Sequence, residues 1–315
     1  GTNNATATIT QLGAQYYDFK LGDLAGTTGS VTMTGGSLTA NDPGLNAAVM
    51  FVGYNGVGNF IQTGGVVSNV DKSSFKYLYL GYNAGSSGSY ELNEGKIAGF
   101  SHLVVGRSGS GIFVQNPGST NAPSYIIVCY GNNSGVYTMS GGVVNVSQLV
   151  VDANGGTGIF TQYAGQVVCS DTLYIGQTSG TGTYTMVGGN LTVSNNVFVG
   201  GYGAGCGILD IGSNATVTCM GLGSVKFEIG DYGGAGGPPG AAGLCILRGG
   251  TINLPYAAGW TRFGSNRAND QGKLQGWGTF NSSTNLTFGF RGFVVADGFG
   301  TDHTLLIANY SSLSS

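Results

Sequence analysis

The sequence predicts an all-β protein, a right-handed parallel β-helix of about nine coils with a β-rich C-terminal segment. Two observations support this prediction. Leading glycines open similar segments at positions 29, 58, 88, 111, 135, 158, 182, 207 and 243, and most of their spacings are 23 to 25 residues. In addition, no segment has the 3.6-residue apolar spacing of an amphipathic helix.

Each coil is expected to contain three short strands separated by glycine-rich turns. The first two follow the leading glycine, as in GVYTMSGGVVNV (135–146) and GTYTMVGGNLTV (182–193). The third is an apolar segment that usually ends on glycine, as in MFVG (50–53) and LYLG (78–81). A β-propeller blade usually needs ~40 residues, so these units are too short for that fold.

Side chains alternate between the two faces of a strand, so the repeat also predicts the core. The inward columns of the first strand are Val31, Phe60, Tyr90, Phe113, Tyr137, Phe160, Tyr184, Leu209 and Cys245, and, two residues on, Met33, Gln62, Leu92, Gln115, Met139, Gln162, Met186, Ile211 and Leu247. The second strand is expected to bury Leu38, Ile97, Val144, Val146, Val167, Cys169, Leu191, Val193, Ile252 and Leu254. The intervening first-strand column, from Thr32 to Ile246, is mostly polar and is expected to face water.

Composition narrows the functional classes. Only 8% of the residues are charged, the net charge is −3 and 41% are hydrophobic, so the chain buries a core beneath a surface of Thr, Ser, Asn and Gly. Such a surface favours an extracellular location over the cytosol, where charge keeps proteins apart. The eleven Lys and Arg form no basic patch, which argues against nucleic acid as a partner. No apolar run reaches the ~18 residues of a membrane helix, so no membrane span is expected.

Three segments are expected along the chain. Residues 1–18 form an N-terminal strand that acts as a cap or an assembly segment. Residues 19–259 form the β-helix repeats. Residues 260–315 form a C-terminal β segment that caps the repeats or packs against them.

No catalytic, cofactor-binding or metal site is predicted, and the chain is not expected to be an enzyme. Enzymes that cleave polysaccharides on this fold need acids gathered on one face, but the fourteen acids here are dispersed over different strand positions. Glu91 and Glu94 are three residues apart on a strand and are expected to face opposite sides. His102 and His303 stand alone and are interpreted as structural.

The cysteines lack the CxxC spacing of a metal site, so no zinc is expected. One disulfide among the three cysteines between 206 and 245 remains an alternative to five free thiols. The five are Cys129, Cys169, Cys206, Cys219 and Cys245.

One outward column is unusually apolar. It runs along the third strands as Lys20, Phe51, Tyr79, Val104, Cys129, Val150, Tyr174, Phe198 and Glu228. Seven consecutive apolar residues make a stripe that should be shielded from water. Three kinds of contact could shield the stripe from water: the chain's own residues 260–315, a second subunit, or a carbohydrate that stacks on the rings.

The repeat also resembles a known group of proteins. The unit G-x-[YF]-x-[MQ]-x-G-G-x-[LV]-x-V, followed by [LV]-x-[VI]-G, is similar to the β-strand repeats of secreted bacterial surface proteins, including autotransporter passenger domains and the large repeat proteins of planctomycetes and verrucomicrobia. The resemblance covers residues 19 to about 255, and GWGTFN (276–281) is similar to closing segments of the latter group. It implies a secreted structural protein of the cell surface.

We therefore expect an extracellular protein that assembles head to tail into a fibre or layer, with itself as partner and surface glycans as a further one. The segment ATATITQL (5–12), with Thr6, Thr8 and Ile9, is uncharged and β-prone, and is expected to dock on the stripe or the C-terminal region of a neighbouring subunit. The competing interpretation is a carbohydrate-active enzyme or a carbohydrate-binding β-helix.

Overall fold

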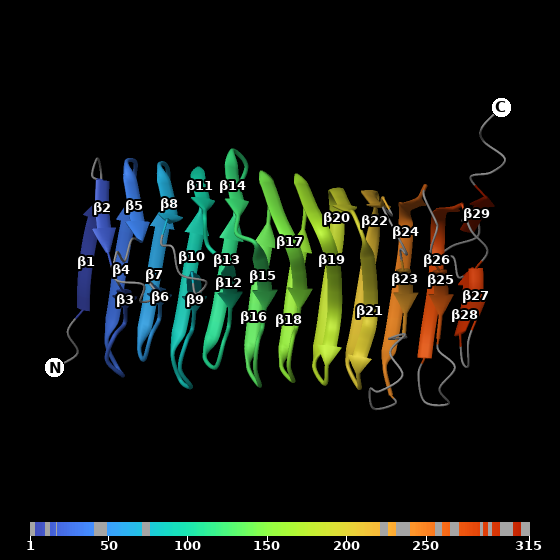
Figure 1. The fold of residues 1–315 in the computed structure, drawn as a ribbon, viewed down its shortest axis with the longest axis horizontal. Helices are drawn as coiled ribbons and strands as arrows, with labels where there is room; N and C mark the ends of the chain where they lie inside the picture. Colours follow the sequence, from blue (N-terminus) through green and yellow to red (C-terminus); the bar gives the residue numbers. More distant parts are fainter. Residues whose placement is uncertain are drawn as a thin grey trace. The chain divides into compact units, whose positions relative to one another are not determined.

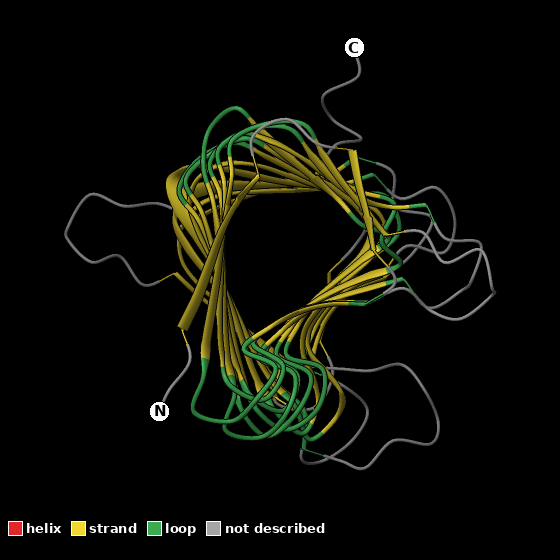
Figure 2. Ribbon diagram, turned by 90° about the vertical axis from the view of Figure 1, so that its left-hand side faces the viewer, coloured by secondary structure: helices red, strands yellow, loops and turns green. Residues whose placement is uncertain are grey.

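The fold is a right-handed parallel β-helix, as the sequence predicts. The computed structural model describes residues 4–9, 13–16, 18–40, 49–70, 76–220, 226–230, 240–255, 260–264, 271–283, 286–288, 292–296 and 305–309. These residues form 29 strands and no helix. Figure 2 shows the strands as the walls of the coils and the loops at their corners. The chain divides into two compact units, residues 1–146 and 147–315.

In the first unit each coil holds three separate short strands, which follow one another in chain order in Figure 1. The first strands are β1 (Asn4–Ile9), β4 (Thr28–Met33), β7 (Val57–Gln62), β10 (Ser87–Leu92), β13 (Ser110–Gln115) and β16 (Ser134–Met139). The second strands are β2 (Gly13–Tyr16), β5 (Ser37–Ala40), β8 (Val66–Asn69), β11 (Gly95–Ala98) and β14 (Ser119–Ala122), and β17 (Val143–Val151) ends in the second unit. The third strands are β3 (Phe19–Leu21), β6 (Met50–Val52), β9 (Tyr77–Leu80), β12 (His102–Val105) and β15 (Tyr125–Val128).

In the second unit several strands continue through a corner, so that one strand serves two walls. The unit contains β18 (Thr157–Gln162), β19 (Gln166–Thr178), β20 (Thr181–Val193), β21 (Asn196–Gly203), β22 (Cys206–Cys219), β23 (Lys226–Ile229), β24 (Ala242–Leu254), β25 (Trp260–Phe263), β26 (Gln271–Ser282), β27 (Leu286–Phe288), β28 (Gly292–Ala296) and β29 (Leu305–Asn309). β19, for example, pairs through its first half with β20 and through its second half with β21.

The leading glycines align coil over coil, which confirms the repeat. In the first unit, Gly29, Gly58, Gly88, Gly111 and Gly135 are parallel register partners. In the second, the series Gly158, Gly182, Gly207 and Gly243 continues into Gly272 and Gly292. At the N-terminus Ala5 stands opposite Gly29. The described strands therefore contain three coils beyond the nine glycine-led repeats, those that begin with β1, β26 and β28.

Both end segments belong to the β-helix ladder in the part of the chain that is described. β1 pairs with β4 and β2 with β5, so no break in pairing marks the boundary expected at residue 18. β25 pairs with β23, and β27 with β25. β25 and β27 thus extend the third-strand wall of their unit. This differs from one of the three covers considered for the stripe, in which residues 260–315 fold over it.

The predicted core columns are confirmed. Every residue of both inward first-strand columns is at most 4% exposed, and the predicted second-strand residues are buried as well. In the first unit the rings of Phe60, Tyr90, Phe113 and Tyr137 stack in sequence, with centroids 4.7–5.2 Å apart and interplanar angles below 20°. The ~4.8 Å spacing of parallel strands produces this ladder, because it lies within the range of centroid distances at which aromatic rings stack. Ile246 is the exception in the polar column and is 8% exposed.

The buried glutamines are paired with tyrosines of the next coil, an arrangement that the sequence reasoning missed. The Tyr90 hydroxyl donates to Gln62 Oε1 at 2.6 Å, and the Tyr184 hydroxyl donates to Gln162 Oε1 at 2.7 Å. Gln62 Nε2 in turn donates to the carbonyl of Gly65 at 3.0 Å. A buried amide without partners would cost about 1–3 kcal/mol, so these bonds allow polar groups inside the core.

The corner after each third strand has a left-handed backbone. Glycine usually occupies it, as at Gly53 and Gly81, where φ is 79° and 67°. Two corners hold other residues, Cys129 with φ 69° and Asp152 with φ 64°. This position of Cys129 corrects the sequence prediction, which placed it on the outward stripe. The register partner of Val104 is Ile127 instead.

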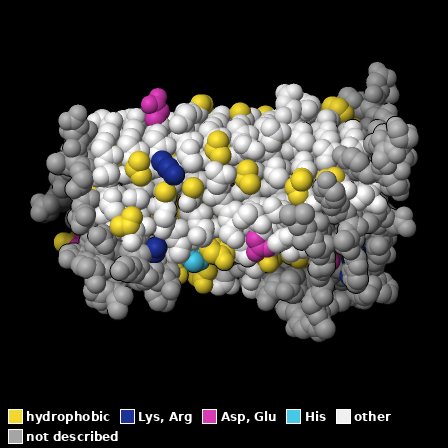
Figure 3. Space-filling view, turned by 45° about the horizontal axis from the view of Figure 1, so that its top comes forward, with side chains coloured by type: hydrophobic (Ala, Val, Ile, Leu, Met, Phe, Trp, Pro, Cys, Tyr) yellow, Lys and Arg dark blue, Asp and Glu magenta, His cyan; other side chains and the backbone are white. Residues whose placement is uncertain are grey.

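The surface is largely uncharged, as Figure 3 shows for one face of the molecule. The salt bridges of the described residues include Lys20 with Asp18 and Arg248 with Asp210. No helix that could cross a membrane is found among the described residues.

Candidate functional site

The outer face of the third-strand wall in the first unit carries three parallel rows of side chains. The strand row is Phe51, Tyr79, Val104 and Ile127, which are successive register partners. The entry row lies two residues earlier and is Tyr77, His102 and Tyr125. The corner row directly follows the corner residues and is Tyr54, Tyr82, Arg107 and Tyr130.

Rings of the corner row cover the start of the strand row. Phe51 and Tyr79 stack with centroids 5.7 Å apart. Tyr82 meets both of them edge-on, at 4.8 and 4.9 Å, and Tyr54 meets Phe51 in the same way. Phe51 is therefore only 7% exposed. The apolar stripe is thus shielded here by side chains of its own coils, a cover that was not among the three considered from the sequence.

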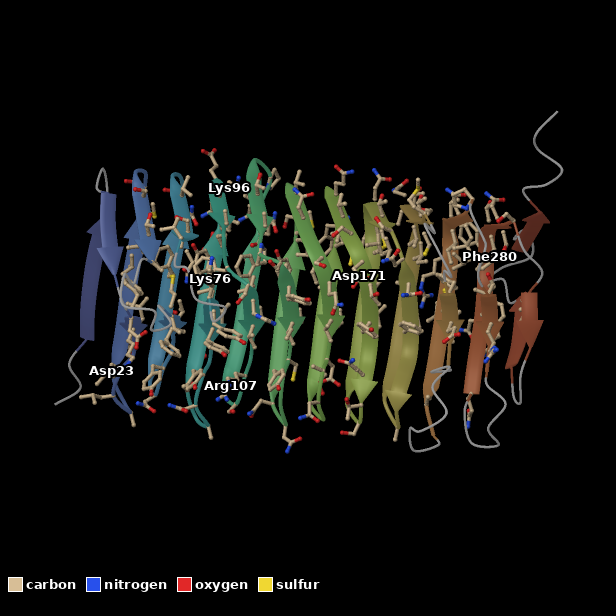
Figure 4. The ribbon with its side chains drawn as sticks, in the orientation of Figure 1. Asp23, Lys76, Lys96, Arg107, Asp171 and Phe280 are labelled. Atoms are coloured by element: carbon tan, nitrogen blue, oxygen red, sulfur yellow. The ribbon has the colours of Figure 1, made fainter. Side chains whose placement is uncertain are left out.

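Cations extend the corner row. The Lys20 ammonium lies 4.7 Å from the Tyr54 ring centroid, and the Arg107 guanidinium lies 4.4 Å from that of Tyr82. Figure 4 places Arg107 at the same edge of the wall as Asp23. Within the described part of the chain no carboxylate is in salt-bridge distance of Arg107.

The strand row changes from rings to short side chains at Val104, and a hollow of about 190 Å³ lies there. Val104 and Ile127 continue the strand row under the hollow, after the ring of Tyr79. The residues that line it come from all three rows: Tyr77, Tyr79, His102, Val104, Arg107, Ile127 and Tyr130.

Burial controls the protonation of the groups around the hollow. It raises the pKa of the Tyr79 hydroxyl above its ordinary value, so this group stays a neutral donor at pH 7. It lowers the pKa of the His102 imidazole, which favours the neutral ring. The Ser101 hydroxyl donates to the carbonyl of Lys76 at 2.9 Å and lies 3.1 Å from His102 Nδ1. Nδ1 is thus assigned the proton, which leaves Nε2 as an acceptor.

The predicted interface residues on the stripe do not share one environment. Phe51, Val104, Val150 and Phe198 are 2–7% exposed within a single chain, so they offer little surface to a second subunit. Tyr79 and Tyr174 are partly exposed. In the second unit Tyr174 stacks on Phe198 with centroids 5.3 Å apart. The charged end of the stripe, Glu228, is fully buried and stands opposite Arg262 in the neighbouring strand.

The predicted N-terminal interface residues are placed by register. Thr6 and Thr8 pair with Ser30 and Thr32, whose column faces outward, whereas Ile9 pairs with Met33 of the core column. The strand that holds them is the first rung of its own β-helix. The docking of this strand on the stripe or the C-terminal region of a neighbouring subunit stays a prediction. A neighbouring subunit would have to pair with the edge of β1 that faces away from β4.

The acids occupy separate places. Asp152 is fully buried at its corner, where its Oδ1 accepts from the backbone N–H of Gly156 at 3.2 Å. Asp171 accepts from the amides of Asn195 and Gln148 at 2.8 Å, and these bonds hold its pKa below the ordinary value. Glu94 is exposed. The described residues contain no cluster of three or more potential metal ligands.

All five cysteines are free thiols, and four of them are buried. Burial raises the pKa of Cys169 and Cys219 to about 12, which suppresses the reactive thiolate. We therefore expect a thiol reagent at pH 8 to modify Cys206 alone in the folded protein and all five thiols in denaturant. Mass spectrometry of the labelled protein would show this. Labelling that persists in the folded Cys206→Ser variant would contradict the burial of the other four cysteines.

The corner row was missed because it begins where the strand pattern stops. Its signal is the repeated GYN of residues 53–55 and 81–83. Their asparagines also form a ladder, in which Asn83 Nδ2 donates to Asn55 Oδ1 at 2.7 Å. An asparagine that recurs at the same place after two successive corners indicates that these coils are stacked in register.

Comparisons with known proteins leave the site to be interpreted from its own geometry. The chain matches no protein-family model, no curated protein and no solved structure.

Proposed function

We propose that this protein is an extracellular structural protein of the cell surface that assembles head to tail by stacking one β-helix on the next. The observation that carries the proposal is the position of β1. Its six residues pair in unbroken parallel register with β4, and β4 is its only neighbour among the described strands. A strand paired on one edge offers the backbone groups of its other edge to another chain.

The C-terminal strands supply a complementary edge. β28 and β29 each have one neighbour among the described strands, and both pair with β26. Contact between the unlike ends of two molecules is heterologous and does not close on itself, so it propagates as a filament. The low charge supports association, since a net charge of −3 on 315 residues provides little repulsion between molecules.

The proposal predicts that one lysine at the terminal edge blocks assembly. In Thr8→Lys the new charge sits on β1, in register with the outward Thr32. We expect Thr8→Lys to remain a folded monomer while the wild type sediments as a polymer, because edge lysines prevent strand addition.

The matched control is Thr138→Lys, in the same outward column but inside the ladder. It should assemble like the wild type. Analytical ultracentrifugation of the wild type, Thr8→Lys and Thr138→Lys measures which of them assemble. Equal sedimentation of wild type and Thr8→Lys would argue against assembly through β1.

A further inference from the structure

We propose that the hollow beside Arg107 binds the uronic acid units of an anionic polysaccharide. The site is formed within the first unit and is independent of the assembly edge at β1. The first argument is geometric. The strand row stacks Phe51 on Tyr79 and then has only Val104 where a third ring would stand. A six-membered ring placed above Val104 would continue this stack.

The hollow is large enough for one sugar ring but not for a larger ligand. Its volume of about 190 Å³ is below the ~300–1,000 Å³ that pockets for drug-sized ligands occupy. An extended cofactor would not fit, whereas one sugar residue of a chain lying on the surface would. The amphipathic rings that line the hollow offer apolar surface to the C–H groups of a sugar and hydroxyls to its polar edge.

The positive charge of Arg107 favours an acidic sugar as the ligand. Arg107 is partly exposed, lines the hollow and has no carboxylate partner among the described residues. A guanidinium binds a carboxylate through two parallel hydrogen bonds, and this geometry recognises a uronate. The whole protein is slightly acidic, with a sequence pI near 5.2, so net charge does not attract a polyanion to it. Attraction must come from this local cation.

The remaining polar groups suit a polyhydroxylated ligand. The lining includes Tyr77, Tyr79 and Tyr130, each of which carries a hydroxyl, and His102, whose Nε2 atom is an acceptor in the assigned tautomer. One carboxylate partner surrounded by several hydroxyl partners matches a sugar acid better than a simple aromatic acid, which has few groups to satisfy them.

Affinity electrophoresis with calcium-free polygalacturonate as the probe tests the site. We expect polygalacturonate to retard the wild-type protein and neutral dextran not to do so. Arg107→Gln removes the cation, and Val104→Phe fills the hollow with the missing ring. Each should weaken binding by about tenfold or more, as expected for loss of a charge-assisted pair or of the binding space. Both variants should still assemble, and Arg107→Gln, at a partly exposed side chain, should keep the wild-type melting temperature.

Lys96→Gln is the matched control, because it removes one positive charge from β11, in the second-strand wall, which Figure 4 shows at the side of the view opposite Arg107. It should bind like the wild type. The proposal is overturned if polygalacturonate fails to retard the wild type, if dextran retards it equally, or if Arg107→Gln and Val104→Phe bind as well as Lys96→Gln.

Discussion

Replacing Tyr137 with alanine is expected to destabilise the fold by about 3–5 kcal/mol, the usual cost of removing a buried aromatic ring. The Tyr137 ring is fully buried and stacks on Phe113 with centroids 4.7 Å apart. Its hydroxyl accepts from Asn121 Nδ2 at 2.9 Å and donates to Gln115 Oε1. The substitution removes a rung of the core ladder and takes a partner from each amide. Urea denaturation monitored by circular dichroism measures the loss.

Tyr137→Phe separates the two contributions. It keeps the ring in the stack and removes only the hydroxyl, so we expect a cost of about 1–3 kcal/mol from the amides that lose a partner. If Tyr137→Phe is as stable as the wild type, the hydrogen bonds of the Tyr137 hydroxyl with Gln115 and Asn121 contribute nothing to the free energy of unfolding.

Gly111→Ala is expected to have a comparable or larger effect, above about 4 kcal/mol, because it introduces a side chain where two backbones touch. A Cβ at this position would lie 2.1 Å from the backbone nitrogen of Gly106 and 2.6 Å from the carbonyl carbon of Val105. Both atoms belong to the corner of the neighbouring wall and cannot move without disturbing the ladder. The same denaturation experiment applies.

The matched control is Gly85→Ala. Gly85 has φ +80°, but a Cβ there meets nothing within 4 Å. Its cost should be only the ~1–2 kcal/mol of a left-handed alanine. Gly111 has no positive φ, so its substitution tests close approach alone. A loss in Gly111→Ala no larger than that in Gly85→Ala would contradict close approach of the walls as the reason for the leading glycines.

The sequence predicts the core well because the relevant pattern is local. Alternation along a strand and recurrence from coil to coil act on the same residues, so Phe113 and Tyr137 could be assigned to one inward column. The end coils were harder to see. Ala5 replaces the leading glycine in the first, and Gly272 and Gly292 have dissimilar flanking residues.

The site was predicted only in part. The strand row was visible as an apolar column, but its register failed at VCYG (128–131), whose glycine suggests the corner. The chain instead turns at Cys129, and a cysteine with positive φ is not something that a sequence pattern indicates. Tyr82 and Arg107 directly follow third-strand segments, LYLG (78–81) and LVVG (103–106), and were assigned no role from the sequence. Their packing over the strand row depends on the fold of the corner, for which the repeated GYN gives a signal at Tyr82 but not at Arg107.

Electron microscopy of the negatively stained wild-type protein, over a range of concentrations, tests the proposed assembly most directly. The proposal predicts unbranched filaments that lengthen as the concentration rises. In the filaments, the ~4.8 Å strand spacing should continue across the junctions between molecules. Single particles of one chain's mass at every concentration would contradict it.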